Sequence, residues 1–389
     1  MSEVAEDMNI PRIRYVGFSK PWESHKLGEI ATITSGYMGN SLLSTGQCRL
    51  TRIETIADGK VNESKVGYSN KKPDDCFLLK YGDILYSNIN SIDHIGKVAQ
   101  YQGNTQLYHG INLLRLSPNN TISSTFLFYI LNTEGKKSWA RTHANQAVSQ
   151  ASINQSLLAS QDISLCSVKE QQQIGSFFNN LDNLISLHQQ KHTQLIAIKK
   201  AMLEKMFPKE GENFPELRFA GFTGPWERRK LGELFVFRYG DGNTNPSNGG
   251  KYPVFGAGGI QGGYTKYNAE NSIVIGHMGD AGCVSWGEGK HFVTYNGTIT
   301  KAKNKIFSSK FGYYLLLHMN LRKYRGGTGL PFLTYEMLTE METMSPTNAR
   351  ESKKITNYLT YFDTLITLHQ KKIDQLQHIK KAFLDKMFV

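Results

Sequence analysis

Two stretches of the chain, residues 170–207 and 351–388, carry a long regular alternation of apolar and polar side chains. In the first, apolar or long side chains recur at steps of four and three residues from Phe177 to Met202. The second repeats the same steps from Tyr358 to Phe383. A period of about 3.5 residues is typical of a helix that packs along a seam against another helix. Neither stretch contains proline, so each is expected to form one helix, roughly 55 Å long.

The two stretches are copies of one another. Aligned without gaps they are identical at 19 of 38 positions. A second repeat relates residues 11–30 to residues 215–234, with 11 of 20 positions identical and the words PWE and KLGE in both. We expect Trp22 and Trp226 to anchor each half in its own core, because an isolated tryptophan is usually a packing residue. Internal repeats of this kind predict two halves with one layout.

The segments between the repeats, residues 31–169 and 235–350, have dissimilar sequences but one order of elements. Alternating apolar positions predict strands, and continuous apolar runs after them predict one helix in each half. In the first half we expect strands at 82–87, 95–101 and 110–118 and a helix from 124; in the second, strands within 271–286 and 292–302 and a helix at 310–320.

These patterns predict a mixed α/β fold (α+β), in which each of two globular domains is followed by a long helix and the halves are related by a pseudo-twofold repeat. The sequence PKEGENFP breaks the first helix and forms a linker. The predicted divisions are a first domain at 1–169, its helix at 170–207, the linker at 208–215, a second domain at 216–350 and its helix at 351–389.

Composition favours a polyanionic partner. The 389 residues carry a net charge of +12, which suits nucleic acid first and an anionic surface second. The N-terminal sequence MSEVAEDMNI lacks the basic and apolar regions of a signal peptide, and the longest apolar runs are too short to span a bilayer. The four cysteines are widely separated. We therefore expect a cytoplasmic protein without a disulfide framework.

Several stretches of the sequence come near to catalytic motifs but do not fit them. The glycines of GAGGIQGG (256–263) match neither a dinucleotide fingerprint nor a phosphate-binding loop. The tetrapeptide 245–248 departs at two of four positions from the Asn-Pro-Pro-Tyr expected of an adenine methyltransferase. Asp280 with Glu288 and Lys290 has a nuclease-like spacing that arises easily by chance in a glycine-rich turn. We predict no catalytic residues in this chain.

A metal site is not predicted either. His188 and His192 lie four residues apart on one helix face, but the second copy has Ile373 at the position that matches His192. Zinc sites need three or four ligands in a fixed geometry.

Polar and basic side chains interleaved with aromatic ones remain, and they gather in the turns and in the loops after the predicted helices. Arginine and lysine can pair with phosphates or guanine, and asparagine and glutamine can pair with adenine. The alternative for each residue is a solvated loop. The DNA-binding candidates are Ser87, Asn88, Asn90, Ser91, Lys136, Lys137, Arg141, Asn145, Gln146, Ser149 and Gln150 in the first half, and Arg238, Tyr239, Asn243, Asn245, Lys251, His277, Arg322, Lys323, Tyr324, Arg325 and Thr328 in the second.

Taken together, the chain resembles the specificity subunit of Type I restriction–modification systems, HsdS. The resemblance is carried by the PWE…KLGE openings, by SINQSLL…EQQQI before the first helix, and by LDNLISLHQ…IKKAML with its LHQ/IKKAF partner. The pieces GDILYSNINSIDHIGKVA and SIVIGHMGDAGCV also look like target-recognition domains of that family. The second helix departs from the pattern, since it opens with ARESKKI (349–355) where the first has Glu170 and Gln171.

The resemblance implies that each domain reads one part of a split, asymmetric double-stranded DNA target. It implies that the two helices pair as an antiparallel coiled coil that holds the domains apart as a ruler. The chain itself would be non-catalytic. Two modification subunits would methylate adenine N6 with S-adenosylmethionine, and restriction subunits would use ATP and Mg²⁺ to translocate and cleave.

On this reading the helix-pairing residues are those of the predicted seam. They are Leu181, Leu184, His188, Lys191, Leu195 and Ile198 in the first helix, and Phe362, Leu365, His369, Lys372, Leu376 and Ile379 in the second. Ile174, Phe178, Ile185 and Leu187 lie outside this seam, and we expect them to dock against a recognition domain or a modification subunit.

Two other functions remain open from the residues. One is a scaffold without affinity for DNA, in which a coiled coil joins two protein-binding domains. The other is a catalytic nuclease or methyltransferase half, which the missing motifs argue against.

Overall fold

The computed structural model of the chain describes residues 9–39, 43–56, 59–146, 150–242, 246–303, 307–327 and 329–389. They form two compact units. The first unit holds Met1–His188 and Lys372–Val389, and the second holds Gln189–Lys371. The sequence predicted a linear division into domain and helix. Instead, each unit contains a segment of both long helices.

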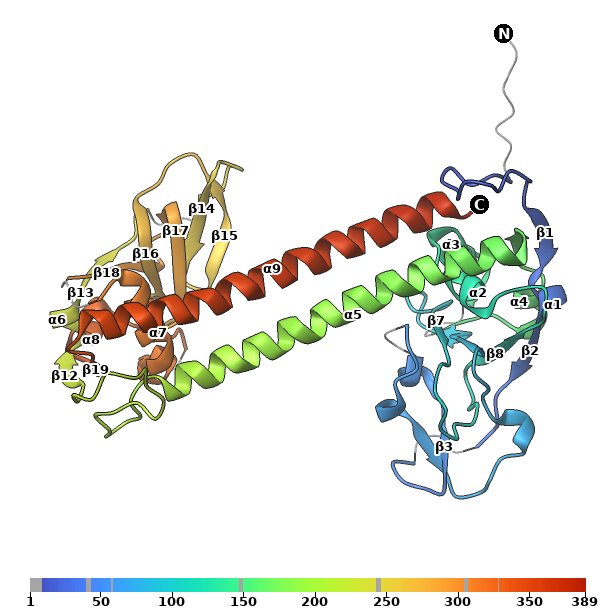
Figure 1. Ribbon diagram of the computed structural model, residues 1–389, viewed down its shortest axis with the longest axis horizontal. Coiled ribbons are helices and arrows are strands. Elements are labelled where there is room, and N and C mark those ends of the chain that lie inside the picture. The colour runs from blue at the N-terminus through green and yellow to red at the C-terminus, as the bar shows by residue number, and fades with distance from the viewer. Residues whose placement is uncertain are drawn as a thin grey trace, which may run out of the picture. The chain divides into compact units, whose positions relative to one another are not determined.

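The long helices are α5 (Val168–Lys205) and α9 (Ala349–Met387), and each is an unbroken ribbon in Figure 1. Each begins and ends about two residues earlier than the repeat predicted. The N-terminal part of α5 belongs to the first unit and its C-terminal part to the second, whereas α9 runs through the units in the opposite order.

The helices pack antiparallel within each unit. In the first unit, the Phe178 ring lies 5.7 Å from that of Phe388, and Asp182 pairs with Lys380 four residues later in α5. Partner numbers therefore fall in α9 as they rise in α5. In the second unit, Lys199 pairs with Asp363, and Met206 shares a core cluster with Ile355.

The stripe that each helix turns inward has the predicted steps but not the predicted phase. In α5 and the residue that follows it, the buried and half-buried positions of the stripe are Ile174, Phe178, Leu181, Ile185, His188, His192, Leu195, Lys199, Met202 and Met206. In α9 the same repeat positions are Ile355, Leu359, Phe362, Ile366, His369, Ile373, Leu376, Lys380, Phe383 and Met387.

Half of the predicted seam is therefore misplaced by one residue. Leu181, His188, Leu195, Phe362, His369 and Leu376 belong to the stripe. The prediction is wrong for the other six. Leu365 is half-buried but falls between the steps of the stripe. The remaining five are exposed, namely Leu184, Lys191, Ile198, Lys372 and Ile379. Ile174, Phe178 and Ile185, which were expected to dock against a recognition domain or a partner, are buried in the first unit, whereas Leu187 is exposed.

The first unit is built on an antiparallel sheet in the order β2-β8-β5-β7. Its strands are β2 (Ala31–Ser35), β5 (Ile84–Tyr86), β7 (Val98–Gln100) and β8 (Leu114–Pro118). Helix α2 (Ser124–Leu131) packs on β7 and β8, and α3 (Glu134–His143) follows it. The chain enters through β1 (Glu23–Lys26) and α1 (Leu27–Ile30), and it leaves through α4 (Gln155–Ala159) and β11 (Asp162–Leu165), which pairs with β1.

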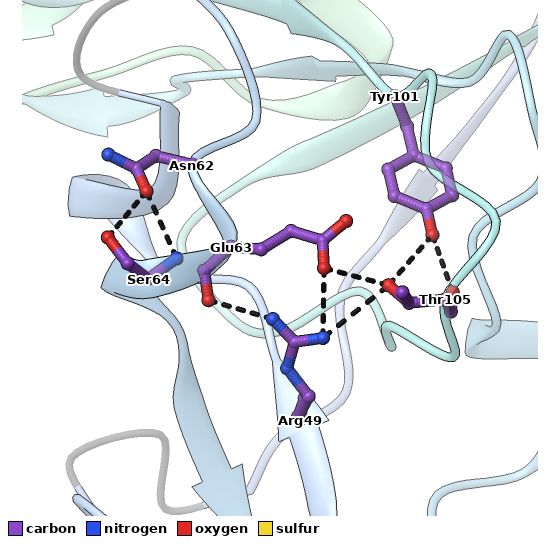
Figure 2. A network of polar contacts seen from close by, with 6 residues as sticks. All are labelled: Arg49, Asn62, Glu63, Ser64, Tyr101 and Thr105. Atoms are coloured by element: carbon purple, nitrogen blue, oxygen red, sulfur yellow. Dashed lines mark hydrogen bonds and ion pairs between the residues drawn. The ribbon is translucent and has the colours of Figure 1, made fainter.

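A side lobe is inserted between β2 and β5. It contains β3 (Cys48–Leu50), β4 (Gly67–Ser69) and the short helices Ile53–Ile56, Glu63–Lys65 and Asp75–Phe77. Arg49 holds it together by donating to the carboxylate and the main-chain carbonyl of Glu63 at 2.9 and 2.8 Å, as Figure 2 shows. The hydroxyl of Thr105 donates to the same carboxylate at 2.9 Å, and Tyr101 donates to the Thr105 carbonyl.

The second unit repeats the same sheet order, β13-β18-β16-β17, and adds a hairpin, β14-β15, beside β17. Its strands are β13 (Phe235–Tyr239), β14 (Tyr252–Gly256), β15 (Gly259–Tyr264), β16 (Ala269–Gly276), β17 (Val284–Val293) and β18 (Gly297–Ala302). Helix α7 (Ser309–Met319) lies against β16, β17 and β18 (Figure 1). Strands β12 (Glu227–Lys230) and β19 (Glu342–Ser345) pair as β1 and β11 do. Helices α6 (Leu231–Leu234) and α8 (Tyr335–Glu340) correspond to α1 and α4.

The units therefore share one frame and differ in what is inserted into it. In sequence, the side lobe of the first unit lies between β2 and β5. The β14-β15 hairpin of the second unit lies between the equivalent strands, β13 and β16. The GAGGIQGG segment forms the tip and second strand of that hairpin. The mixed α/β fold with a repeated layout is confirmed.

The repeated sequence segments pack against one another in the cores of the two units. Trp22 and Trp226 are both buried, as predicted. Trp22 lies edge-on to Phe126 of α2 and Phe388 after α9, whereas Trp226 contacts Phe311 of α7 and Phe207 after α5. The KMF sequence at the end of α5 thus packs in the second unit against the second PWE segment. The KMF sequence at the end of α9 packs in the first unit against the first PWE segment.

A buried ion pair fixes the start of each long helix. Arg14 forks onto Glu170 with N–O distances of 2.6 and 2.8 Å, and Arg218 forks onto Glu351 with the same two distances. Both carboxylates are fully buried. The altered opening of the second helix therefore keeps its essential acid, since Glu351 does what Glu170 does. None of the described helices has an apolar stretch long enough to cross a membrane.

One buried histidine makes the stability of the first unit depend on pH. His109 is fully buried, its Nε2 donates to the Leu113 carbonyl at 2.9 Å, and its Nδ1 has no partner among the described residues. Burial lowers the pKa of His109 to about 4. The folded state therefore holds a neutral ring, while the unfolded chain takes up a proton below about pH 6.5. Its contribution to stability is complete above pH 6.5 and is lost as the pH falls towards 4.

We expect His109→Gln, which keeps a donor for Leu113, to remove this pH dependence. Between pH 7 and pH 5 the wild-type protein should lose about 2 kcal/mol more unfolding free energy than the variant. Urea unfolding of both proteins at the two pH values measures the difference, and other titrating groups cancel in it. A difference between the proteins that does not change with pH would contradict the assignment.

Candidate nucleic-acid interface

In the first unit, the turn between β5 and β7 meets the loop that follows α3. Strand β10 (Ala151–Ser152) lies between β6 (Ile89–Asn90) of the turn and β9 (Asn145–Gln146) of the loop. Two groups of polar residues that are far apart in the sequence are thereby brought together. Their spacing in the sequence gave no sign of this pairing.

In the second unit, the turn between β16 and β17 meets the loop that follows α7 in the same way. Phe332 of the loop bridges to Met278 of the turn and to Gly326, and the loop main chain at Pro331 accepts from Gly279. Arg322 pairs with Asp280 of the turn at 2.6 Å. Each unit thus presents one composite edge made of a sheet turn and a loop after a helix.

The two composite edges share one hydrogen-bonded clamp, which we define as Asn88 with Ile153 and His277 with Leu333. Ile153 N donates to Asn88 O at 2.8 Å, and Leu333 N donates to His277 O at 2.9 Å. The side chains add a second bond in the opposite direction, from the turn residue to the loop carbonyl. Asn88 Nδ2 lies 3.2 Å from Ile153 O, and His277 Nδ1 lies 2.9 Å from Leu333 O. Different residue types therefore tie the loop to the turn at equivalent places.

A glycine closes each turn beside its clamp. Gly96 and Gly282 have φ of 77° and 80°, a conformation that favours glycine. A Cβ at Gly96 would come within 2.6 Å of Ala140 Cβ in α3, and one at Gly282 would come within 2.7 Å of the main chain after α7. The turn can thus approach the helix only because these positions lack a side chain.

The candidates of the first unit divide into surface and structural residues. Ser91, Asn145, Gln146 and Gln150 are exposed on the composite edge, while Asn88 and Asn90 are half-buried. Ser87 is buried and its hydroxyl accepts from Asn90 Nδ2 at 3.0 Å, so the prediction that it contacts DNA is wrong. Ser149 lies outside the described residues.

The basic residues of α3 are partly engaged by the protein itself. Lys136 donates its amine to the Asp162 carbonyl, and Arg141 pairs with Glu134. Burial lowers the pKa of Lys136 and of Lys137. For these three side chains, contact with phosphate stays a prediction.

The second unit places more charge at its edge. Lys323, Tyr324 and Arg325 are exposed in the loop after α7, next to Arg322. Arg238 donates to the Asn268 carbonyl at 2.9 Å, and the amine of Lys251 lies 5.0 Å above the Tyr252 ring. Asn243, Asn245 and Thr328 lie outside the described residues. The predictions of DNA contact for the exposed residues stay predictions.

An aromatic cluster around His277 was not fully predicted. The Tyr239 ring lies 4.4 Å from His277 and 5.1 Å from Tyr335, and Tyr295 lies 6.0 Å from His277. Tyr295, Tyr335 and Phe332 are large exposed rings on this edge. The sequence named Tyr239 and His277 but missed the others, because they come from two other segments, at 295 and at 332–335. Exposed rings beside basic side chains can stack on bases, while the charges meet phosphates.

Among the described residues, no group of three or more histidine, cysteine, aspartate or glutamate side chains could hold a metal ion. The geometry of the composite edges is that of a binding surface made of turns, amides, rings and cations.

Comparison with known proteins gives this surface a context. Residues 19–197 and 224–378 match the family model described as Type I restriction modification DNA specificity domain. The two matched ranges correspond to the two halves of the internal repeat.

A relative along nearly the whole length is the putative type I restriction enzyme MjaX specificity subunit of Methanocaldococcus jannaschii. It is 30% identical over 391 residues, with 94% of this chain and 92% of the relative covered.

Two solved structures share the fold. One is the S subunit of a Type I restriction–modification system from M. genitalium, with a TM-score of 0.67, 18% identity, and 98% and 99% of the two chains covered. The other comes from a study of complex assembly and conformational transition of the type I R-M system, with a TM-score of 0.52, 15% identity, and 95% and 98% covered.

Proposed function

The chain belongs to the Type I restriction modification DNA specificity family, and on that premise we propose that each unit reads one half of a split DNA sequence for partner subunits that carry out the chemistry. The chain recognises DNA and is not itself the catalyst. The proposal concerns how recognition is divided between the two composite edges.

The observation that carries the proposal is the repeated frame with dissimilar edges. The sheet order and the clamp recur in both units, whereas the residues on the turns and loops differ. Equivalent frames would present their edges to DNA in equivalent ways, and different edge residues would then select different bases. The expected target has two unlike half-sites separated by bases that are not read.

Charge supports DNA as the ligand. The net charge of +12 favours association with a polyanion, and phosphate contacts give such binding a strong dependence on salt. The exposed loop from Arg322 to Arg325 concentrates three cations in four residues. A scaffold that binds only proteins would not show salt-dependent retention of DNA.

We propose that the complex contains two modification subunits and, for cleavage, restriction subunits. In that arrangement S-adenosylmethionine is bound by the modification subunits, and ATP and Mg²⁺ are used by the restriction subunits. The chemistry of the composite edges suits contact with DNA rather than any of these cofactors. Because the substrate is cellular and incoming DNA, we place the protein's action in the cytoplasm.

The clamps allow each half-site to be tested separately. His277→Ala removes the side-chain bond to Leu333 and should loosen the second unit's loop. Asn88→Ala removes the side-chain bond to Ile153 and should do the same in the first unit. In a host that expresses the complete system, we expect each variant to relax a different half-site, with discrimination at the affected bases falling about tenfold. Methylome sequencing reads both half-sites at once.

The two variants serve as controls for one another, because each leaves the other unit intact. Relaxation of the same half-site by both, or wild-type specificity in both, would contradict the division of recognition between units. A wild-type system that methylates no split sequence would refute the proposed function itself.

A further inference from the structure

Three helices of the first unit are joined by one polar triad. Tyr129 of α2 donates to Asp182 Oδ2 of α5 at 2.9 Å, and Lys380 of α9 lies 2.6 Å from the other carboxylate oxygen, Oδ1. The Lys380 amine also lies 5.5 Å from the centre of the Tyr129 ring. Asp182 and Lys380 are largely buried, with side-chain exposures of 19% and 25%. Each member therefore contacts both others.

The second unit contains the same triad with the long helices exchanged. Tyr314 of α7 donates to Asp363 Oδ2 of α9 at 2.6 Å, and Lys199 of α5 lies 2.5 Å from Asp363 Oδ1. The Lys199 amine lies 5.6 Å from the centre of the Tyr314 ring. The two aspartates occupy one repeat position and the two lysines another. Both tyrosines, in contrast, come from the dissimilar segments of the chain.

The phenols are held as donors. Burial, together with the neighbouring carboxylate, raises the pKa of Tyr129 and of Tyr314 well above the usual range. With the phenol protonated, one carboxylate oxygen is satisfied by the hydroxyl and the other by the ammonium group. A buried carboxylate without both partners would be costly.

The triads constrain the relative orientation of the helices more sharply than the surrounding apolar core does. In the first unit, the Tyr129 ring lies 5.0 Å from that of Phe178, at a tilt of 35°, within a large apolar cluster, which supplies stability. Apolar burial is roughly proportional to area and has no direction, so it defines the relative orientation of the helices less sharply than hydrogen bonds do. Hydrogen bonds weaken steeply when their angles depart from linearity. Three helices that share one carboxylate are therefore held in one relative orientation.

We propose that the two triads are the joints that fix the orientation of each unit's sheet and its α2 or α7 on the two long helices, and thereby fix the number of base pairs that the complex accepts between its half-sites. The proposal rests on the proposed function. One base pair of B-DNA rises by about 3.4 Å, so a displacement of that order at a recognition edge exchanges one accepted spacing for the next. Tyr129 and Tyr314 are accordingly positioning residues and touch no DNA.

The test uses the complete complex with Tyr129→Phe, Tyr314→Phe and the double variant. Phenylalanine keeps the ring and its packing and removes only the hydroxyl. We expect both half-sites to stay unchanged, while methylation at targets whose spacing is one base pair longer or shorter rises about tenfold in each single variant. The double variant should show a broader distribution of accepted spacings. Methylome sequencing of the host supplies all of these values.

Tyr361→Phe is the matched control, because Tyr361 is an exposed tyrosine on α9 outside both triads, and it should leave the spacing unchanged. Asp182→Asn, which keeps an acceptor for Tyr129 but weakens the attraction to Lys380, should give a smaller change than Tyr129→Phe.

Two outcomes would overturn the proposal. One is a wild-type distribution of spacings in the double variant. The other is an even loss of methylation at all targets with no new spacing, which would mean that the triads only stabilise the fold. Both are distinct from failure of the proposed function, in which the wild-type complex itself would methylate no split target.

Discussion

The structure depends on one constraint, namely that each long helix must bury a single continuous stripe in two different units. The stripe of α5 begins with Ile174 and Phe178 in the first unit and ends just after the helix with Met206 in the second. In α9 it begins with Ile355 in the second unit and ends with Met387 in the first. In proteins most of the stability of a helix comes from packing of this kind. Neither unit has a complete core unless both helices are present, and the exchange of Phe207 and Phe388 between the two PWE segments follows from this.

Specific polar contacts turn that packing into a defined geometry. The Arg14–Glu170 and Arg218–Glu351 forks fix where each helix starts, and the triads relate each helix pair to α2 or α7. The composite edges are formed by turns and loops that connect equivalent strands and helices in the two units. Variation is confined to the insertions, turns and loops, so the surface can differ between units while the frame does not. This separation is what recognition of two unlike half-sites requires.

The sequence predicted the repeat, the element order and the helical period, because these depend on local pattern. It did not predict the phase of the stripe. Leu184 and Ile185 are both apolar, and it is Ile185 that joins the core cluster of the first unit while Leu184 is exposed. Ile198 and Lys199 reverse the usual preference, because Asp363 receives the Lys199 amine while Ile198 stays exposed. Hydrophobicity alone could not reveal an ion pair formed with a residue so distant in sequence.

The candidate site was predicted at the level of segments rather than side chains. Turns and loops rich in Asn, Gln, Arg and Lys were predicted to contact DNA, and for their exposed residues this stays a prediction; the buried Ser87 could not be told apart from them, because its burial at the end of β5 depends on sheet packing. The clamps and the aromatic cluster escaped notice, since they join segments whose approach is set by tertiary structure.

The central claim is that the two helices act together as the element that spaces two readers. The most direct measurement is the methylome of a complex in which seven residues are inserted after Gln190 of α5 and after Lys371 of α9. Seven residues preserve the period of the stripe and add about 10 Å to each helix. The account predicts a spacing longer by up to about three base pairs, with both half-sites unchanged. An unchanged spacing, or an altered half-site, would contradict it.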